Sequence, residues 1–174
     1  MSGKKKTNLS ELREIALKDI DKVKIGLVVA EWNPEVTGSL EKGAIDTLKH
    51  YGITGQNIKS IKVPGSFELP MGARIMLKYE KYDAIICLGC VIKGETSHNE
   101  YINHAVSTGI THLGLTSGIP CIFGVLTPLN MEQALDRAGG KHGNKGVEAA
   151  VAALEMVRLE QQVEKRSKSI GFGG

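Results

Sequence analysis

Blocks of apolar residues alternate with amphipathic stretches along this chain, and the alternation predicts strands followed by helices. Four short apolar runs are rich in Val and Ile, which is typical of strands buried on both faces of a parallel sheet. The predicted strands lie at residues 23–30, 57–63, 82–92 and 119–126. The predicted helices lie at residues 34–51 and 69–79, from residue 97 onward, between residues 130 and 139, and from about residue 147 onward.

Strands that alternate with helices predict an α/β domain, with a four-stranded parallel sheet covered by helices on both faces and right-handed crossovers. Ligands of such sheets bind beyond the carboxyl ends of the strands. We therefore expect the four loops that follow the strands to meet at one edge. These loops contain Trp32-Asn33, Ser66-Phe67-Glu68, Lys93 to His98, and Thr127-Pro128.

The two ends of the chain depart from this block pattern. Residues 1–10 are polar and lysine-rich, and we expect residues 1–20 to be a flexible segment, with a short helix beginning within Ser10–Leu17. Residues 161–174 are predicted to be a frayed, basic tail that ends in glycine. Residues 21–160 are then the predicted folded domain, which is long enough to enclose a hydrophobic core.

The charge and hydropathy of the chain exclude two classes of partner. Its net charge is +3, and the cluster Lys4-Lys5-Lys6 alone accounts for that excess, so the body of the chain has no nucleic-acid footprint. No apolar run approaches the roughly 18 residues that span a bilayer, and no apolar segment follows the N-terminal lysines. We expect a cytoplasmic protein that does not bind membranes.

The three cysteines, Cys87, Cys90 and Cys121, lie in or at the end of apolar, strand-like runs. Cys87 and Cys90 have the spacing of a redox motif, but a redox pair belongs at a helix N-terminus, where its thiolate is stabilised. The pattern favours buried thiols that pack in the core.

The loop after the third predicted strand offers an anion site next to a proton carrier. Unpaired backbone N–H groups at a helix start bind phosphate, and we expect such a start within Gly94 to Ser97. His98 follows in the first turn, where an imidazole can transfer protons near neutral pH, although a surface histidine fits the spacing equally well. The five histidines have no metal-type spacing, so we expect no metal.

Other candidate residues have both a functional and a structural interpretation. Trp32 follows a strand end and either stacks on a flat ring or packs against the body. Asn33 suits a polyol or pyrimidine edge, but asparagine before proline is also an ordinary turn residue. Glu68 is able to bind sugar hydroxyls, and Arg137 is able to bind phosphate. Taken alone, both are better explained as charges that complement a helix dipole, Glu68 at a helix start and Arg137 at a helix end.

Several segments together, in order over roughly residues 20–160, resemble one family. They are Trp32-Asn33, Pro64 to Pro70, Gly89 to His98, Phe123 to Thr127, Arg137 to Gly139, and Gly143 to Gly146. This combination is similar to the 6,7-dimethyl-8-ribityllumazine synthases of riboflavin synthesis. The resemblance implies a flavodoxin-like three-layer α/β/α sandwich. It also implies condensation of 5-amino-6-ribitylaminouracil with 3,4-dihydroxy-2-butanone 4-phosphate, without a cofactor.

The resemblance also implies roles for individual residues. His98 is the expected proton shuttle, and Trp32 is expected to stack on the pyrimidine. The other residues expected around the heterocycle and the ribityl chain are Asn33, Ser66, Phe67, Glu68, Val91, Ile92, Lys93 and Phe123, the last of which enters the site of a neighbouring subunit. The residues expected to hold the phosphate are Gly94, Glu95, Thr96 and Arg137.

The family places its active sites between the subunits of a five-membered ring. The short connection at residues 139–146 resembles that of members that pack twelve rings into a 60-subunit shell, so we expect such a shell, with riboflavin synthase as a candidate partner. Two positions depart from the family pattern. Trp32 replaces the more usual phenylalanine, and Asn99 follows His98 where an aromatic residue is common.

Two other classes of protein fit parts of the pattern. A non-catalytic flavin or lumazine carrier would use the same aromatic surface, and a structural shell protein would need only the interfaces. The presence of both His98 and Arg137 favours an enzyme, a transferase of the lumazine synthase type.

Overall fold

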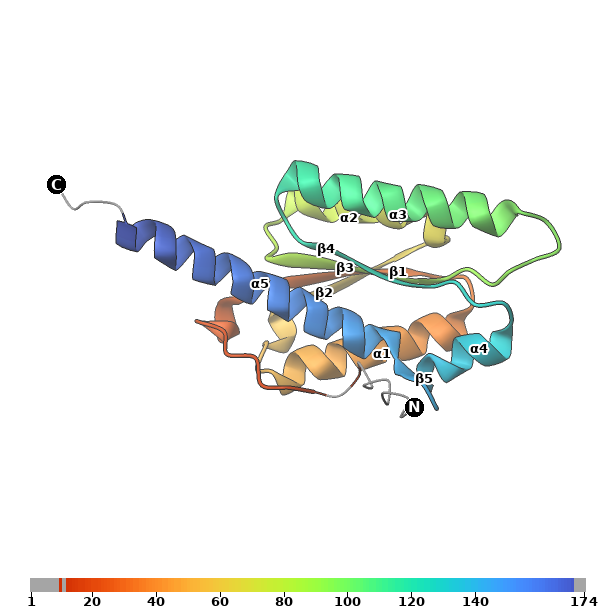
Figure 1. Ribbon diagram of the computed structural model, residues 1–174, viewed down its shortest axis with the longest axis horizontal. Coiled ribbons are helices and arrows are strands. Elements are labelled where there is room, and N and C mark those ends of the chain that lie inside the picture. The colour runs from red at the N-terminus through yellow and green to blue at the C-terminus, as the bar shows by residue number, and fades with distance from the viewer. Residues whose placement is uncertain (1–9, 11, 171–174) are drawn as a thin grey trace, which may run out of the picture.

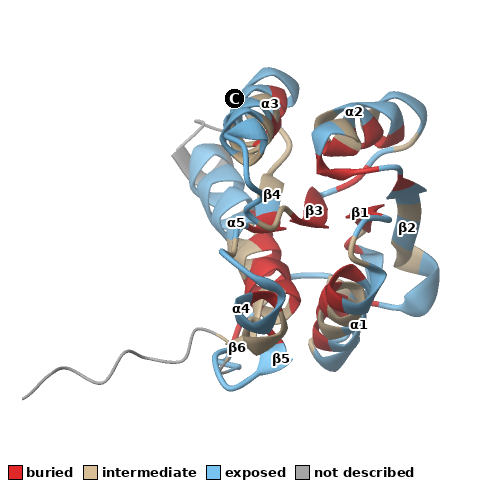
Figure 2. Cartoon of the chain, turned by 90° about the vertical axis from the view of Figure 1, so that its right-hand side faces the viewer, coloured by how far each residue is buried: buried red, intermediate tan, exposed pale blue. Residues whose placement is uncertain are grey.

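The computed structural model describes residue 10 and residues 12–170, and these residues form a three-layer sandwich (Figure 1). Its centre is a parallel sheet with the strand order β2-β1-β3-β4. One face is covered by α2 and α3, and the other by α1, α4 and α5 (Figures 1 and 2). The strands are β1 (Ile25–Ala30), β2 (Ile58–Val63), β3 (Ala84–Cys90) and β4 (Cys121–Leu126). The helices are α1 (Pro34–His50), α2 (Leu69–Tyr79), α3 (His98–Ser117), α4 (Met131–Asp136) and α5 (Lys145–Ile170).

The two central strands, β1 and β3, are buried along their whole length (Figure 2). Successive side chains of a strand point to opposite faces, so an all-apolar strand contributes to two cores. Leu27 and Val29 pack in the core against α1 and α5, whereas Val28 and Ala30 pack in the core against α2 and α3. Continuous apolar runs therefore become central strands here.

The start of α5 is anchored on α1 by the side chain of Asn144. Its amide nitrogen donates to the carbonyl of Ser39 (3.1 Å), and its oxygen accepts from the N–H groups of Gly146 (2.8 Å) and Val147 (3.3 Å). A Cβ at Gly146 would lie 1.9 Å from the carbonyl oxygen of Leu40 on α1. The two helices thus approach so closely that only glycine fits at this crossing.

The observed elements follow the predicted blocks, and the α/β sandwich is confirmed. The glycine-rich loop expected at residues 139–146 instead contains a short antiparallel hairpin, β5 (Ala138–Gly140) and β6 (Gly143–Asn144). Short 3₁₀ turns complete the described chain at η1 (Ile20–Lys22), η2 (Gly55–Asn57) and η3 (Ser66–Glu68).

The helix predicted within Ser10–Leu17 is wrong, because residues 12–17 have no helical structure. Ile15 is buried in the core instead, and the Tyr51 hydroxyl donates to the carbonyl of Arg13 (2.5 Å). These tertiary contacts replace the local hydrogen bonds of a helix.

The domain limits at residues 20 and 160 stay a prediction. Residues 12–20 lie against the body, where the Lys18 N–H donates to the side chain of Gln161 (3.0 Å), and α5 continues through Ile170. The remaining parts of the two predicted ends, residues 1–9, residue 11 and residues 171–174, lie outside the described residues. No helix between residues 12 and 170 is both long and apolar enough to cross a lipid bilayer.

Candidate functional site

A pocket of about 530 Å³ opens at the carboxyl ends of β1, β2 and β3, where the sequence predicted a ligand site. It is formed by the loop after β1, the turn η3 that follows β2, and the segment from the end of β3 into α3. The predicted site residues that line it are Trp32, Asn33, Ser66, Phe67, Glu68, Val91, Ile92, Gly94, Thr96 and His98. Lys93, Glu95, Phe123 and Arg137 do not line it.

Two aromatic side chains at this pocket are open to solvent. Trp32 is 70% exposed and Phe67 is 60% exposed, so neither serves as a core residue in this chain. A Cβ at Gly65 would lie 3.2 Å from both the Trp32 ring and the Glu68 carboxylate. The missing side chain at Gly65 therefore lets the indole and the carboxylate stand close together at one wall.

Asn33 has a structural task as well as a place in the pocket. It adopts a left-handed backbone conformation (φ 57°) directly before α1, which asparagine tolerates better than most residues. Its side-chain amide donates to the carbonyl of Cys90 at the end of β3 (3.1 Å). This hydrogen bond ties the loop after β1 to the loop after β3.

Glu68 closes the turn that begins α2. Its Oε2 accepts a hydrogen bond from the backbone N–H of Gly65 (3.0 Å), which leaves that N–H paired at the start of the turn. The Glu68 carboxylate therefore has a structural role just before α2. The same hydrogen bond orients the carboxylate at the wall of the pocket, so the structural and functional interpretations are compatible.

Backbone hydrogen bonds to the end of β4 and the loop after it hold the segment between β3 and α3. The N–H of Val91 donates to the Leu126 carbonyl (2.8 Å), and the N–H of Lys93 donates to the Pro128 carbonyl (2.9 Å). The backbone N–H groups of Val91 and Lys93 are therefore already paired within the chain. Gly94 to Ser97 are exposed, and His98 is the exposed first residue of α3.

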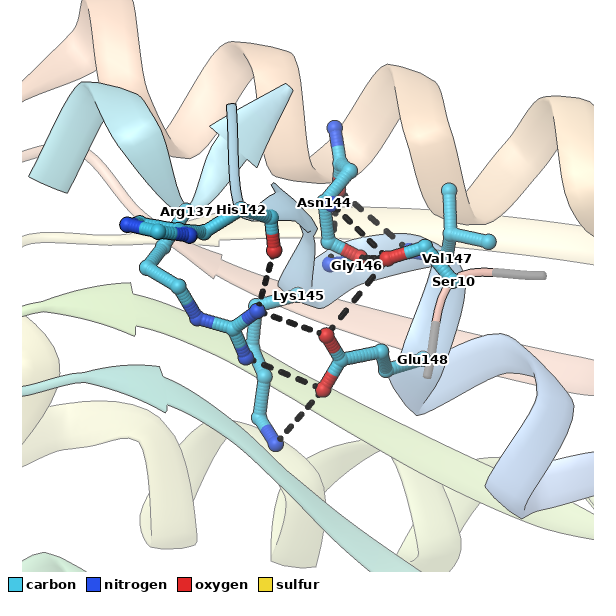
Figure 3. A network of polar contacts seen from close by, with 8 residues as sticks. All are labelled: Ser10, Arg137, His142, Asn144, Lys145, Gly146, Val147 and Glu148. Atoms are coloured by element: carbon cyan, nitrogen blue, oxygen red, sulfur yellow. Dashed lines mark hydrogen bonds and ion pairs between the residues drawn. The ribbon is translucent and has the colours of Figure 1, made fainter. Parts of the chain in front are cut away.

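Arg137 lies elsewhere, in the polar network of Figure 3. It follows α4 and borders a separate pocket of about 490 Å³. Its Nη1 lies 2.8 Å from Oε1 of Glu148 and donates to the carbonyl of His142 (2.6 Å), and its Nη2 donates to Oε2 of Glu148 (3.1 Å). Arg137 is expected to hold phosphate together with Gly94 and Thr96, but it does not line the pocket of its own chain that those two residues line.

Glu148 is a residue that the sequence interpretation missed. Its side chain is only 7% exposed, and Lys145 Nζ also lies 3.3 Å from its Oε2. Burial acts to raise the pKa of Glu148, but the hydrogen bond from Arg137 and the charges of Lys145 and Arg137 outweigh it, so the pKa lies below its ordinary value. In the sequence Glu148 is an ordinary acid in the first turn of a helix, and nothing there signals its burial.

The three thiols are buried or partly buried, as expected. Burial raises the pKa of Cys90 and of Cys121 to about 11, and it raises the pKa of Cys87 further. Thiols that hold their protons are poor nucleophiles, so the structure supports packing over redox chemistry. Within the described part of the chain, no group of three or more His, Cys, Asp or Glu side chains is arranged to hold a metal ion.

A parallel α/β/α sandwich with an aromatic and polar pocket at its strand ends defines a class of small-molecule-binding α/β proteins. Within this class, the chain belongs to the 6,7-dimethyl-8-ribityllumazine synthase family, whose sequence model matches residues 22–161. The predicted family is confirmed.

Three proteins with that name are similar to this chain. The one from Cytophaga hutchinsonii is 56% identical over 132 residues, which cover 76% of this chain and 83% of the relative. The one from Parabacteroides distasonis is 49% identical over 152 residues, 87% of this chain and 95% of the relative. The one from Porphyromonas gingivalis is 50% identical over 139 residues, 80% of this chain and 86% of the relative.

Proposed function

We propose that this chain catalyses the reaction of its family, the penultimate step of riboflavin biosynthesis. It condenses 5-amino-6-ribitylaminouracil with 3,4-dihydroxy-2-butanone 4-phosphate to give 6,7-dimethyl-8-ribityllumazine, phosphate and water. The observation that supports this best is the pocket in which the Trp32 ring, the Glu68 carboxylate and the His98 imidazole meet at the strand ends. The enzyme is a transferase that needs no cofactor, and we place it in the cytoplasm.

Substrate binding in this proposal follows the chemistry of the pocket walls. The exposed faces of Trp32 and Phe67 stack on the pyrimidine, since flat rings bind flat aromatic surfaces. The side chains that hydrogen-bond the ribityl chain are those of Asn33, Ser66 and Glu68. The heterocycle contacts Ile92 and the carbonyl groups of Val91 and Lys93. The N–H groups from Gly94 to Thr96, with the Glu95 backbone among them, bind the phosphate at the positive end of α3.

Each chemical step moves a proton. The substrate amine attacks the ketone and water leaves, the resulting imine loses phosphate, and ring closure expels a second water. A positioned imidazole accelerates such transfers by roughly 10² to 10⁴-fold, and His98 at the pocket wall has this role. Holding the two substrates together in one pocket contributes the rest of the rate enhancement.

The active site of this proposal is shared between copies of the chain. Arg137 and Phe123 lie outside the pocket of their own chain, and they complete the pocket of a neighbour. An exposed apolar stripe supports self-association, since Phe67, Met71, Ile75 and Tyr79 recur every fourth residue on and before α2. The assembly is a pentamer, twelve of which form a 60-subunit shell, and riboflavin synthase is its candidate partner.

The test is to mix the purified protein with both substrates and follow the absorption and fluorescence of the lumazine product. An enzyme forms product at a rate that is proportional to protein concentration. A carrier binds added lumazine or flavin but forms no product, and a purely structural shell protein does neither. Either of these last two outcomes rejects the proposed function.

A further inference from the structure

Three buried polar atoms near the pocket have no hydrogen-bond partner. They are Ser66 Oγ, Asn99 Oδ1 and Asn103 Oδ1, and in the part of the chain that the structure describes no other buried side-chain oxygen or nitrogen lacks a partner. A buried polar atom without a partner is destabilising, so such atoms are rare and need an explanation. Two of these three residues, Ser66 and Asn99, line the pocket.

The two asparagines lie on the buried face of α3. This face is apolar in the second half of the helix, where Val106, Ile110 and Leu113 are buried. Asn99 and Asn103 continue the same stripe toward the helix start, because the steps of four, three, four and three residues keep one face of a helix. Packing alone would favour apolar residues at both positions, since a carboxamide without a partner gains less from burial. The polar half of the stripe is the half next to the pocket.

The chemistry of this corner suits a ligand hydroxyl. Ser66 is 6% exposed, and its hydroxyl can both donate and accept a hydrogen bond. The amide of Asn99 presents either a donor or an acceptor, because a half-turn about its last side-chain bond exchanges oxygen and nitrogen. A ligand hydroxyl also donates and accepts, so its chemistry matches that of both side chains.

We propose that Asn99 is a specificity-determining residue that binds, together with Ser66, a hydroxyl group of the polyol chain of the pyrimidine substrate. This inference rests on the proposed function and adds Asn99 to the residues that bind the substrate. An apolar side chain at this position could not form the hydrogen bond to the polyol hydroxyl. Ser66 Oγ and Asn99 Oδ1 are covered from solvent in this conformation. A rotation about the side-chain bonds of Ser66 and Asn99 brings these atoms to the pocket surface, where the bound substrate becomes their partner.

The test compares two ligands by calorimetric titration. One is an unreactive pyrimidine that carries a ribityl chain, and the other is the same pyrimidine with a plain alkyl chain of equal length. In Asn99→Leu we expect the dissociation constant of the ribityl ligand to rise about tenfold, the effect of one lost buried hydrogen bond, while that of the alkyl ligand changes less than about twofold. Asn103→Leu is the matched control, because it changes the same face one turn away without touching the pocket lining, and it leaves both constants unchanged.

The result separates this inference from the proposed function. If Asn99→Leu weakens both ligands equally, or neither, Asn99 does not recognise the chain hydroxyl and the inference is wrong. If the wild-type protein forms product but Asn99→Leu keeps its preference for the ribityl ligand, only the inference fails. If the wild-type protein binds neither ligand, both fail. Should Asn99→Leu not fold, Asn99→Ala removes the same amide without adding bulk, and it is held to the same outcomes.

Discussion

At the scale of single residues, His98 and Arg137 differ in how their surroundings hold them. His98 is exposed at the start of α3, whereas Arg137 is held by Glu148 and by the carbonyl of His142. A proton carrier needs access to a substrate, and a phosphate ligand benefits from a fixed direction. The two residues therefore suit the separate roles that we propose for them.

Replacement of His98 by alanine should slow the chemistry and spare binding. We expect kcat to fall by roughly 10² to 10⁴-fold with KM nearly unchanged, because the imidazole acts on protons in the transition state rather than on ground-state affinity. Steady-state kinetics measures both constants. The control is His104→Ala, since His104 lies on the same helix outside the pocket and bonds to Thr108. An unchanged kcat in His98→Ala would remove His98 from the mechanism.

Replacement of Arg137 by alanine should act on one substrate. We expect the KM of the phosphate substrate to rise about 10- to 100-fold while the KM of the pyrimidine stays within about twofold, because the lost contact is a charged hydrogen-bonded pair. This variant also removes the arginine partner of the buried Glu148, which then keeps only Lys145 as an ion-pair partner. The double variant Arg137→Ala/Glu148→Gln therefore regains stability but not affinity, and equal rises in both KM values would contradict the assignment.

The lowered pKa of Glu148 makes a prediction about acid stability. A carboxyl group with a lowered pKa in the folded state stabilises the fold above its ordinary value of 4.5, and this contribution is lost as the pH falls through the folded-state pKa. We expect Glu148→Gln to reduce the free energy of unfolding by about 2 kcal/mol at neutral pH, since hydrogen bonds to charged groups have this size. The difference shrinks toward zero in progressively more acidic buffers.

Urea unfolding at a series of pH values measures this difference. Glu160→Gln changes an exposed acid on the same helix, so its effect should stay near zero throughout. A Glu148→Gln deficit that persists unchanged in strong acid would show that the charge of Glu148 is not what stabilises the network.

The residues of the pocket were predicted to different degrees. Trp32, Glu68 and His98 meet because each follows a strand of one parallel sheet, and that order is visible in the sequence. Glu148 and the unpaired amide of Asn99 were not predicted, because their roles depend on burial by segments distant in the chain. Local spacing contains no information about such burial.

At the scale of elements, the apolar blocks predicted the positions of the strands and helices, because these depend on local periodicity. The bounds of α2 match the expected residues 69–79, and each strand ends within two residues of its predicted end. The hairpin of β5 and β6 was not predicted, because it needs left-handed glycines at Gly139 (φ 112°) and Gly143 (φ 83°) and a hydrogen bond from the Lys145 N–H to the Arg137 carbonyl (2.8 Å). Glycine spacing alone does not reveal that pairing.

Two glycines of α1 should respond in opposite ways to alanine. A Cβ at Gly43 would lie 2.7 Å from the Asn144 side chain, which three hydrogen bonds hold in place, so Gly43→Ala should destabilise the fold by about 1–3 kcal/mol. A Cβ at Gly38 meets open space, so Gly38→Ala should stabilise the helix by about 0.5–1 kcal/mol. Chemical denaturation measures both, and equal effects would argue against a specific contact between α1 and Asn144.

At the scale of the whole molecule, the position of Arg137 outside the pocket of its own chain suggests a complementation experiment. Neither His98→Ala nor Arg137→Ala supports full activity alone. If the pocket of one copy uses Arg137 of the next, co-assembled variants regain sites in which both residues are intact, about one quarter of all sites for random equal mixing. Activity is measured on the co-expressed, co-purified assembly. Separately purified variants mixed without subunit exchange are the control, and no regained activity after co-assembly would indicate that each site lies within one chain.

The sequence by itself determined the order of strands and helices, the parallel sheet, and the edge at which a ligand pocket forms. These follow from residue periodicity and from the geometry that joins a strand to the next helix, both of which act over a few neighbouring residues. Only the tertiary structure decided that Glu148 pairs with Arg137 in a buried site, that Asn99 has an unpaired amide oxygen at the pocket, and that Arg137 lies outside the pocket that His98 lines. Burial and pairing depend on segments that meet only after the chain has folded, and so they follow from packing rather than from local pattern.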